Sequence, residues 1–369
     1  MNVLEVVSGY LPDHKAGVPK HIDFLIRKLS DEGIRFCLAA QDVVPGARDG
    51  IKYFRMPAYP LEFVKRIRRW KFAWFDKTLQ SCGASICKEE RIDLIHGHTW
   101  PYGGRQALHL GRRCGIPVAV TLHGTVLDPY SAEKPPAFFD ELKECSRIMV
   151  QKPSALHKLA SWGIPSDRLM LQMGPAVRSR YARVRTPEDV QDLKILFACR
   201  FDPIKNPALL PVLAKELKAR GLPVRITAAG DGPLLDAVKK EAVRLEVADR
   251  LQFPGWVDNI RELHADHSVY LALSEVHSVS DLSLLDAMSD GMVPIAVNSL
   301  DIDYLIQNGK NGFVCAPSAA AIADAVEHMI SHRDVFAEMS REASATALQL
   351  AGENVFVRNH VRLFQEALL

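Results

Sequence analysis

The sequence lacks a long uncharged apolar stretch and has almost no net charge, and each absence removes a class of protein. No uncharged apolar run reaches the roughly 18 residues of a membrane-spanning helix, so no spanning helix is expected. The first residues carry no basic leader before an apolar core, so no signal peptide is expected. The formal net charge is +2 in 369 residues, which argues against bulk attraction to nucleic acid.

Closely spaced cysteines are also absent. The seven cysteines are scattered, their number is odd, and no two form a Cys-x-x-Cys pair. We therefore expect structural thiols in a reducing compartment, which is typical of a cytoplasmic protein. What is present is an ordinary soluble balance, with 48% hydrophobic and 24% charged residues. The length is sufficient for two domains.

The first half of the chain alternates short apolar runs with helical patterns. Residues 20–32 carry apolar side chains at Ile22, Leu25, Ile26 and Leu29, which is the spacing of a helix. Such alternation predicts a parallel sheet covered by helices on both faces. The expected strands are 3–7, 35–40, 93–96, 118–122 and 147–151, with a further helix at about 106–114.

The pattern restarts after a polar stretch at 178–192, which we interpret as an exposed linker. The sequence therefore predicts an α/β protein of two doubly wound domains in tandem, whose ligand sites lie beyond the carboxyl ends of strands. We place them at 1–177 and 178–351, with a C-terminal helix at about 352–369 that returns to the first domain. In the second domain the expected strands are 194–198, 224–229, 252–253, 269–272, 294–297 and 312–314, and the expected helices are 208–220 and 234–245.

Two cations directly follow the apolar run at 194–198. Arg200 and Lys205 have four residues between them and stand in a loop that Pro203 and Pro207 stiffen. Arginine offers phosphate oxygens a planar fork and lysine a point charge. Solvated surface cations are the alternative, but the position at a strand end favours phosphate binding.

A Gly-Asp-Gly turn and a helix carboxylate complete this pattern. Gly230-Asp231-Gly232 follows the next apolar run, and Asp286 stands in Leu-Leu-Asp-Ala-Met. Taken singly, these are an ordinary turn and an ordinary helix acid, and only their order is specific. Together with the cations they suggest a nucleotide-diphosphate site whose carboxylate accepts hydrogen bonds from ribose hydroxyls.

This order resembles the family 4 retaining glycosyltransferases of the GT-B fold, over nearly the whole chain. The resemblance implies that Arg200 and Lys205 bind the donor diphosphate and stabilise the leaving nucleotide. It places Gly230 in the donor-binding turn, and Asp286 where a ribose-binding Glu is usual. Cys199 stands where the family has Gly before the arginine.

The sequence departs from the family at a second acidic position. The family's first Glu, eight residues before the ribose acid, is Ser278 here. Glu275 and His277 lie near enough to contact the sugar if the loop differs. Because every residue except proline has an amide donor, the resemblance still implies a backbone grip on the donor. The donor-binding residues that it implies in this segment are Ser278, Ser280, Asp281 and Leu282.

The first half carries three further matches. Gly17 belongs to the family's Gly-Gly loop, where a glycine lets an acceptor or phosphate approach closely. His98 ends a His-x-His strand, and His123 stands in a Thr-x-His-Gly strand end. The resemblance implies that His123 faces the transferred sugar and acts in catalysis, and that His98 contacts the sugar or acceptor. For each histidine, a structural role is the alternative.

The resemblance implies α-retaining transfer from a nucleotide-diphosphate-sugar without a metal or other cofactor. Asp301 and Asp303 have the spacing of a metal-binding pair, but they fall where the family has a loop near the sugar-phosphate. We expect a structural or substrate-contacting role there. A GT-B sugar-nucleotide epimerase, an altered-donor member, and a non-catalytic sugar- or lipid-binding module remain alternatives.

Residues 62–77 predict a basic, aromatic helix. Phe63, Ile67, Trp70 and Trp74 form one stripe, and cations surround it. Such a helix can lie on an anionic membrane; equally, the stripe can pack on the sheet while the cations face water. The membrane interpretation favours a glycan or lipid-linked acceptor and a peripheral position on the inner face, with no nucleic acid partner. The cations expected to contact the membrane are Arg66, Arg68, Arg69 and Lys71.

Overall fold

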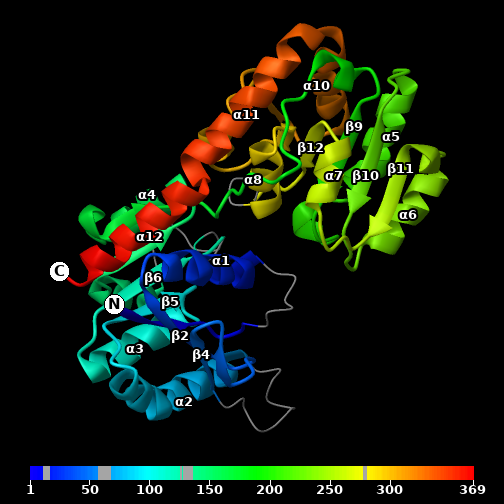
Figure 1. Ribbon diagram of the computed structural model, residues 1–369. Coiled ribbons are helices and arrows are strands. Elements are labelled where there is room, and N and C mark those ends of the chain that lie inside the picture. Colours follow the sequence, from blue (N-terminus) through cyan, green and yellow to red (C-terminus); the bar gives the residue numbers. More distant parts are fainter. Residues whose placement is uncertain (11–16, 57–67, 125–126, 128–135, 277–280) are drawn as a thin grey trace. The chain divides into compact units, whose positions relative to one another are not determined.

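The computed structural model describes residues 1–10, 17–56, 68–124, 127, 136–276 and 281–369, without the side chains of 68–72. The chain forms two compact units (Figure 1). Unit 1 comprises Met1–Met173 and Phe356–Leu369, and unit 2 comprises Gly174–Val355. Each unit has its own sheet, and the predicted α/β fold with two doubly wound domains is confirmed.

Unit 1 is built on a sheet in the order β3-β4-β2-β1-β5-β6-β7-β8, in which only the β3–β4 pair is antiparallel. The chain order reverses between β1 and β5, which makes this the switch point of the sheet. The strands are β1 (Asn2–Val6), β2 (Arg35–Ala40), β3 (Gly46–Arg48), β4 (Ile51–Arg55), β5 (Leu94–His98), β6 (Val118–Leu122), β7 (Arg147–Val150) and β8 (Leu169–Leu171). The helices are α1 (Gly17–Asp31), α2 (Arg68–Glu89), α3 (Gly104–Cys114), α4 (Pro153–Ser161) and α12 (Glu353–Ala367).

Both faces of the unit 1 sheet are covered, because successive residues of each strand point to opposite faces. Leu4 and Val6 of β1 join one apolar cluster, which includes residues of α2 and α3. Val3 joins the other, which includes residues of α1 and the apolar face of α12. Phe356 and Phe364 of α12 are fully buried in this second cluster, so the end of the chain packs against its beginning.

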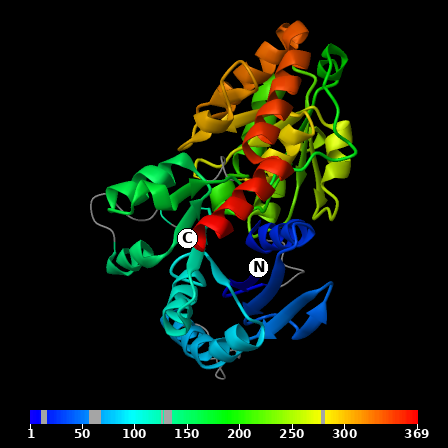
Figure 2. The ribbon, with the colours of Figure 1, turned by 60° about the vertical axis from the view of Figure 1, so that its left-hand side comes forward.

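Unit 2 has a six-stranded parallel sheet in the order β11-β10-β9-β12-β13-β14, with its switch point between β9 and β12. Figure 2 shows the same chain turned by 60°, with the strands of unit 2 in green to orange. Its core holds residues of β9, β10, β12 and β13 together with α5 and α10. The strands are β9 (Lys194–Ala198), β10 (Arg225–Ala229), β11 (Leu251–Gly255), β12 (Val269–Ala272), β13 (Val293–Val297) and β14 (Phe313–Cys315). The helices are α5 (Leu209–Ala219), α6 (Leu235–Arg244), α7 (Arg261–Asp266), α8 (Leu282–Ser289), α9 (Ile302–Leu305), α10 (Ala319–Ser331) and α11 (Phe336–Ala351).

The interpretation of 178–192 as an exposed linker is wrong. This segment packs within unit 2, and the side chain of Arg185 is fully buried there. Its guanidinium donates to the backbone carbonyls of Arg183 at 2.8 Å, Asp290 at 2.9 Å and His267 at 3.1 Å. A charged group is buried here because carbonyl oxygens replace its water.

The predicted aromatic stripe at 62–77 is corrected where the structure describes it. Phe75 and Leu79 of α2 are fully buried, whereas Trp74 is only half-buried. The buried face of α2 is therefore shifted by one position from the predicted stripe. Residues 62–67, including Arg66, lie outside the described residues, as do the side chains of Arg68, Arg69 and Lys71.

Candidate active site

The predicted phosphate-binding cations lie at the switch point of the unit 2 sheet. Both follow β9, and the loop after β12 leads to Asp281 beside them. Lys205 donates to the Asp281 carboxylate at 2.5 Å, and its side chain is 19% exposed. Arg200 is 73% exposed and lies 3.1 Å from Asp202. Lys205 is thus held in a mostly buried ion pair, whereas the ion pair of Arg200 is largely exposed to solvent.

Asp281 also begins α8. Its side chain accepts a hydrogen bond from the backbone N–H of Ser283 at 3.0 Å, in the manner of a helix cap. Burial opposes the charge on Lys205, but Asp281 outweighs this effect and raises the pKa of Lys205. A permanently charged ammonium therefore stands beside the amide groups at the start of α8, where an anion is favoured.

The Gly-Asp-Gly turn packs directly against the loop that carries Arg200. A Cβ atom on Gly230 would lie 2.0 Å from the carbonyl oxygen of Cys199, and Gly230 has φ +136°. The backbone N–H of Phe201 donates to the Asp231 carbonyl at 2.9 Å. Glycine is required here because any side chain would push the two loops apart.

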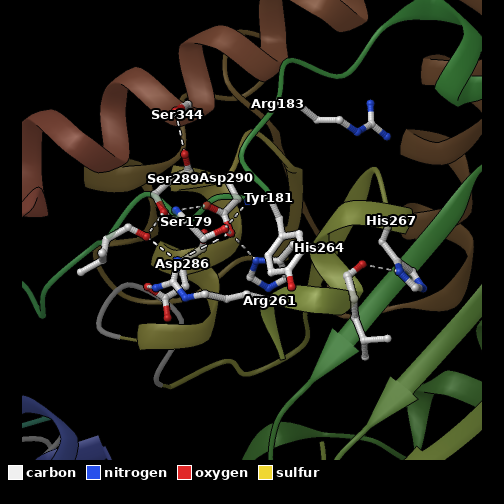
Figure 3. Close-up of polar contacts among 12 residues, drawn as sticks. Ser179, Tyr181, Arg183, Arg261, His264, His267, Asp286, Ser289, Asp290 and Ser344 are labelled. Atoms are coloured by element: carbon white, nitrogen blue, oxygen red, sulfur yellow. Dashed lines mark hydrogen bonds and ion pairs between the residues drawn. The ribbon is translucent and has the colours of Figure 1, made fainter. Parts of the chain in front are cut away.

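Asp286, the predicted ribose-binding acid, is held by Arg261 of α7. The guanidinium donates to its carboxylate at 2.5 Å, and the Asp286 side chain is 22% exposed (Figure 3). Burial raises the pKa of Asp286 to about 6, although Arg261 opposes the shift. Sequence reasoning missed Arg261, because nothing in its local pattern distinguishes it from a surface cation.

Asp290, one helical turn beyond Asp286, is a second acid in this arrangement and is buried. Its fully buried carboxylate accepts hydrogen bonds from Ser179 and from Nδ1 of His264, each at 2.8 Å (Figure 3). Arg261 lies 3.6 Å from it. The spacing of two acids four residues apart on one helix face is a signal that could have identified Asp290.

A hollow after β12 and β13 contains the acids near the predicted sugar-phosphate loop. Glu275, Asp301 and Asp303 line it together with Asn298 and Gln307. Asp301 adopts φ +67°, a conformation that ordinarily favours glycine or asparagine. Ser278 and Ser280 lie outside the described residues, whereas Leu282 packs against Gly174.

The two candidate histidines of unit 1 are hydrogen-bonded to each other. Nε2 of His123, just after β6, lies 2.9 Å from Nδ1 of His98 at the end of β5. Nε2 of His98 lies 2.6 Å from the carboxylate of Glu5, which is in β1. All three side chains are buried. Gly17 begins α1, and the residues that precede it, 11–16, lie outside the described part of the chain.

Glu5 is the member of this cluster that sequence reasoning missed. It also lies 2.9 Å from Nδ1 of His96, whose Nε2 is 2.8 Å from the hydroxyl of Thr121. Burial alone would raise the pKa of Glu5, but His96 and His98 outweigh it and lower this pKa to about 2. An acid within an otherwise apolar strand was the available signal, because such a carboxylate needs buried partners.

Two more histidines border the cluster. The ring of His21 in α1 meets that of His123 edge-on at 4.7 Å, and lies 5.6 Å from that of His360 in α12. Burial lowers the pKa of His21 well below its ordinary value and that of His360 to about 3. These rings are therefore neutral near pH 7.

Donor atoms of Glu5, His96 and His98 lie within 4.8 Å of one another, which is close enough for a metal ion. However, the Glu5 carboxylate is already hydrogen-bonded to Nε2 of His98 at 2.6 Å and lies 2.9 Å from Nδ1 of His96. The donor set fits a hydrogen-bond network without a metal, and transfer without a metal cofactor stays a prediction.

Comparisons with known proteins identify the family of this chain. Residues 16–171 match the family described as Glycosyltransferase Family 4, and residues 180–347 match the one described as Glycosyl transferases group 1. EpsF of Bacillus subtilis (strain 168), a protein named as a glycosyltransferase, is 31% identical over 330 residues, covering 81% of this chain and 79% of EpsF. The chain belongs to the family 4 glycosyltransferases. The predicted enzyme class, a transferase of sugars, is therefore confirmed.

Two further relatives of this glycosyltransferase have names that state their products. N-acetyl-alpha-D-glucosaminyl L-malate synthase of Bacillus anthracis is 22% identical, with 80% of each chain covered. Alpha-monoglucosyldiacylglycerol synthase of Streptococcus pneumoniae (strain ATCC BAA-255 / R6) is 23% identical, covering 86% of this chain and 78% of that protein.

Solved structures share the fold of the glycosyltransferase. A glycosyltransferase from Rickettsia africae ESF-5 matches with a TM-score of 0.78 at 17% identity, covering 100% of this chain and 98% of that chain. HepE of Anabaena, in complex with UDP, matches with a TM-score of 0.75 at 15% identity, covering 99% of this chain and 100% of that chain.

Proposed function

We propose that this glycosyltransferase moves a sugar, with retention of configuration, from a nucleoside-diphosphate-sugar to a glycan or lipid-linked acceptor in cell-surface polysaccharide or glycolipid synthesis. One observation carries the proposal. Lys205 and Asp281 form an ion pair at the switch point between β9 and β12, beside the start of α8. Ligands of doubly wound sheets bind at such a switch point, and diphosphates favour helix amino ends.

The charges suit the leaving group of this reaction. When the sugar–phosphate bond breaks, negative charge develops on the departing phosphate oxygen. Lys205 is already positioned by Asp281, so little reorganisation is needed before it stabilises that charge. Arg200 is exposed and can close on the diphosphate from the solvent side. This assignment needs no metal.

Asp286 is proposed to accept hydrogen bonds from the ribose hydroxyls. Arg261 holds its carboxylate in place and is itself held by the Val177 carbonyl. The UDP in the HepE complex supports a nucleoside-diphosphate donor. Glu275 and Asp303, in the hollow after β12 and β13, are proposed to contact the sugar or the acceptor, a role left open by the serine at position 278.

Lys205→Ala tests the phosphate assignment. Loss of a preorganised donor to a developing charge should lower turnover by about 10²–10³-fold, with the fold intact by circular dichroism. Arg225→Ala is the matched control, because Arg225 is an exposed cation at the amino end of β10.

A thermal-shift screen over sugar nucleotides first identifies the donor. Release of free nucleoside diphosphate only with acceptor then distinguishes transfer from epimerisation.

Near-normal turnover of Lys205→Ala with that donor would overturn the phosphate assignment. Equal losses in Lys205→Ala and Arg225→Ala would indicate a nonspecific charge effect instead.

A lipid-linked acceptor implies binding at a membrane surface, for which the basic residues 66–71 are the proposed contact. None of the helices among the described residues is long and apolar enough to cross a membrane. The name of the diacylglycerol-glucosylating relative supports a lipid acceptor. Each cation near an anionic leaflet contributes about 1 kcal/mol, so four Gln substitutions should abolish binding. The four substituted residues are Arg66, Arg68, Arg69 and Lys71.

Co-sedimentation with phosphatidylserine vesicles at low and high salt measures this effect, and donor binding should stay unchanged. A wild type that stays in the supernatant at low salt would favour a soluble glycan acceptor.

A further inference from the structure

We propose that Glu5 is a positioning residue that acts through His98 to fix the tautomer of His123. In that tautomer, Nδ1 of His123 accepts a hydrogen bond from a hydroxyl of the substrate. The identity of this hydroxyl, on the sugar or its acceptor, rests on the proposed function. The tautomer itself does not.

The direction of the hydrogen bonds follows from the carboxylate. Glu5 is ionised and can only accept, so Nε2 of His98, at 2.6 Å, must carry the proton. Burial lowers the pKa of His98 to about 4, so its ring is neutral and has one N–H. Nδ1 of His98 is therefore an acceptor, and it receives the Nε2–H of His123 at 2.9 Å.

His123 is the last and least buried ring of this relay. His123 is neutral because burial lowers its pKa, so with the proton on Nε2 its Nδ1 carries a lone pair. Among the described residues, Nδ1 of His123 has no hydrogen-bond partner, and His123 is 7% exposed whereas Glu5 and His98 are 0% exposed. His21 stands edge-on to the ring of His123 and restricts its rotation.

The cost of burying Glu5 supports a role beyond packing. An isolated buried carboxylate costs several kcal/mol, and strand β1 is otherwise apolar around it. An ionised glutamate can only accept hydrogen bonds, so it fixes the proton on Nε2 of His98. An apolar residue or an amide at this position could not do so. Glutamine could reverse both hydrogen bonds by donating to Nε2 of His98, which would move the proton of His123 to Nδ1.

Nitrogen NMR of the whole chain with ¹⁵N-labelled histidine tests the relay without any ligand. Long-range ¹H–¹⁵N correlations distinguish protonated from bare ring nitrogens, and a His123→Asn sample assigns the signals. We expect protonated Nε2 and bare Nδ1 for His123 in the wild type, and a shift of the proton to Nδ1 in Glu5→Gln. The matched control is Thr121→Val, which alters the buried His96 branch and should leave the His123 tautomer unchanged.

A wild-type His123 protonated at Nδ1 would overturn the proposal even if Glu5→Gln failed to fold. The proposal would also be overturned if the purified wild type contained one equivalent of a metal and Glu5→Gln did not. A metal bound there would replace the Glu5–His98 hydrogen bond.

Kinetics connect the relay to function. With the donor found by the thermal-shift screen, Glu5→Gln should lower kcat at least about tenfold with little change in donor KM. An unchanged kcat would remove the functional part of the proposal. A wild type inert toward every sugar nucleotide counts instead against the proposed function, and the NMR result still decides the relay.

Discussion

The two units stabilise their buried polar groups by different means. In unit 1, imidazole rings surround a single carboxylate, Glu5, and hydrogen bonds link them. In unit 2, the guanidinium groups of Arg185 and Arg261 meet carboxylates and backbone carbonyls. Imidazoles change charge in mildly acidic solution, whereas guanidinium groups do not. The cluster of unit 1 therefore responds to proton concentration, whereas the guanidinium groups of unit 2 keep their charge.

The largest expected difference between the units is in their loss of stability at acidic pH. The folded-state pKa values of His21, His98, His123 and His360 lie below the ordinary value of 6.5, so the unfolded chain binds more protons below pH 6.5. Their contribution to stability is complete above pH 6.5 and is lost as the pH falls. Below pH 6.5, each histidine that stays neutral in the folded chain lowers the free energy of unfolding by about 1.4 kcal/mol per pH unit. Among its described residues, unit 2 has two such histidines, His264 and His267, and should decline less steeply.

Hydrogen exchange of each unit at pH 7 and pH 5 measures this difference. His21→Phe removes one titrating ring that has no hydrogen-bond partner among the described residues, so it should flatten the decline of unit 1. Equal declines in the two units would contradict the comparison.

Removal of a fixed charge should act on unit 2 alone. Arg185→Ala removes the donor from the buried carbonyls of Arg183 and His267 and leaves the Asp290 carbonyl with the Arg183 N–H alone, at an expected cost of about 3–5 kcal/mol in unfolding free energy. Arg183→Ala is the control, because its ion pair with Asp189 is partly exposed and should contribute less than about 1 kcal/mol. Urea unfolding with hydrogen exchange assigns each loss to a unit. Similar costs for both variants would contradict a special role for the buried guanidinium.

The smallest expected effect concerns the donor. Asp286→Asn should raise the donor KM about tenfold with little change in kcat, since the ribose contact is present in both bound substrate and transition state. The pKa of Asp286 is about 6, so below that pH the wild-type carboxyl gains a proton and donor affinity should fall. Steady-state kinetics from pH 5 to 8 measure both effects. A drop in kcat at saturating donor with unchanged KM would place Asp286 in the chemical step instead.

From the sequence alone, the alternation of strands and helices was predictable, except for β3, β4 and β8, and so was the position of Arg200 and Lys205 after β9. The period of apolar residues depends only on near neighbours, so β9, β10 and β12 were predictable from it. Arg200 and Lys205 were predictable because residues directly after a parallel strand lie at the ligand-binding edge of the sheet.

Which polar residues are buried, and with what they pair, depended on the fold. Arg185 looked like part of an exposed linker, but its partners include His267, 82 residues away. Glu5 and His98 are 93 residues apart, and no local pattern relates them. Trp74 and Phe75 are both aromatic, and their neighbours in space decided that Phe75 is buried. A polar or aromatic side chain is buried where distant segments supply partners or space, and that depends on how the chain folds back on itself.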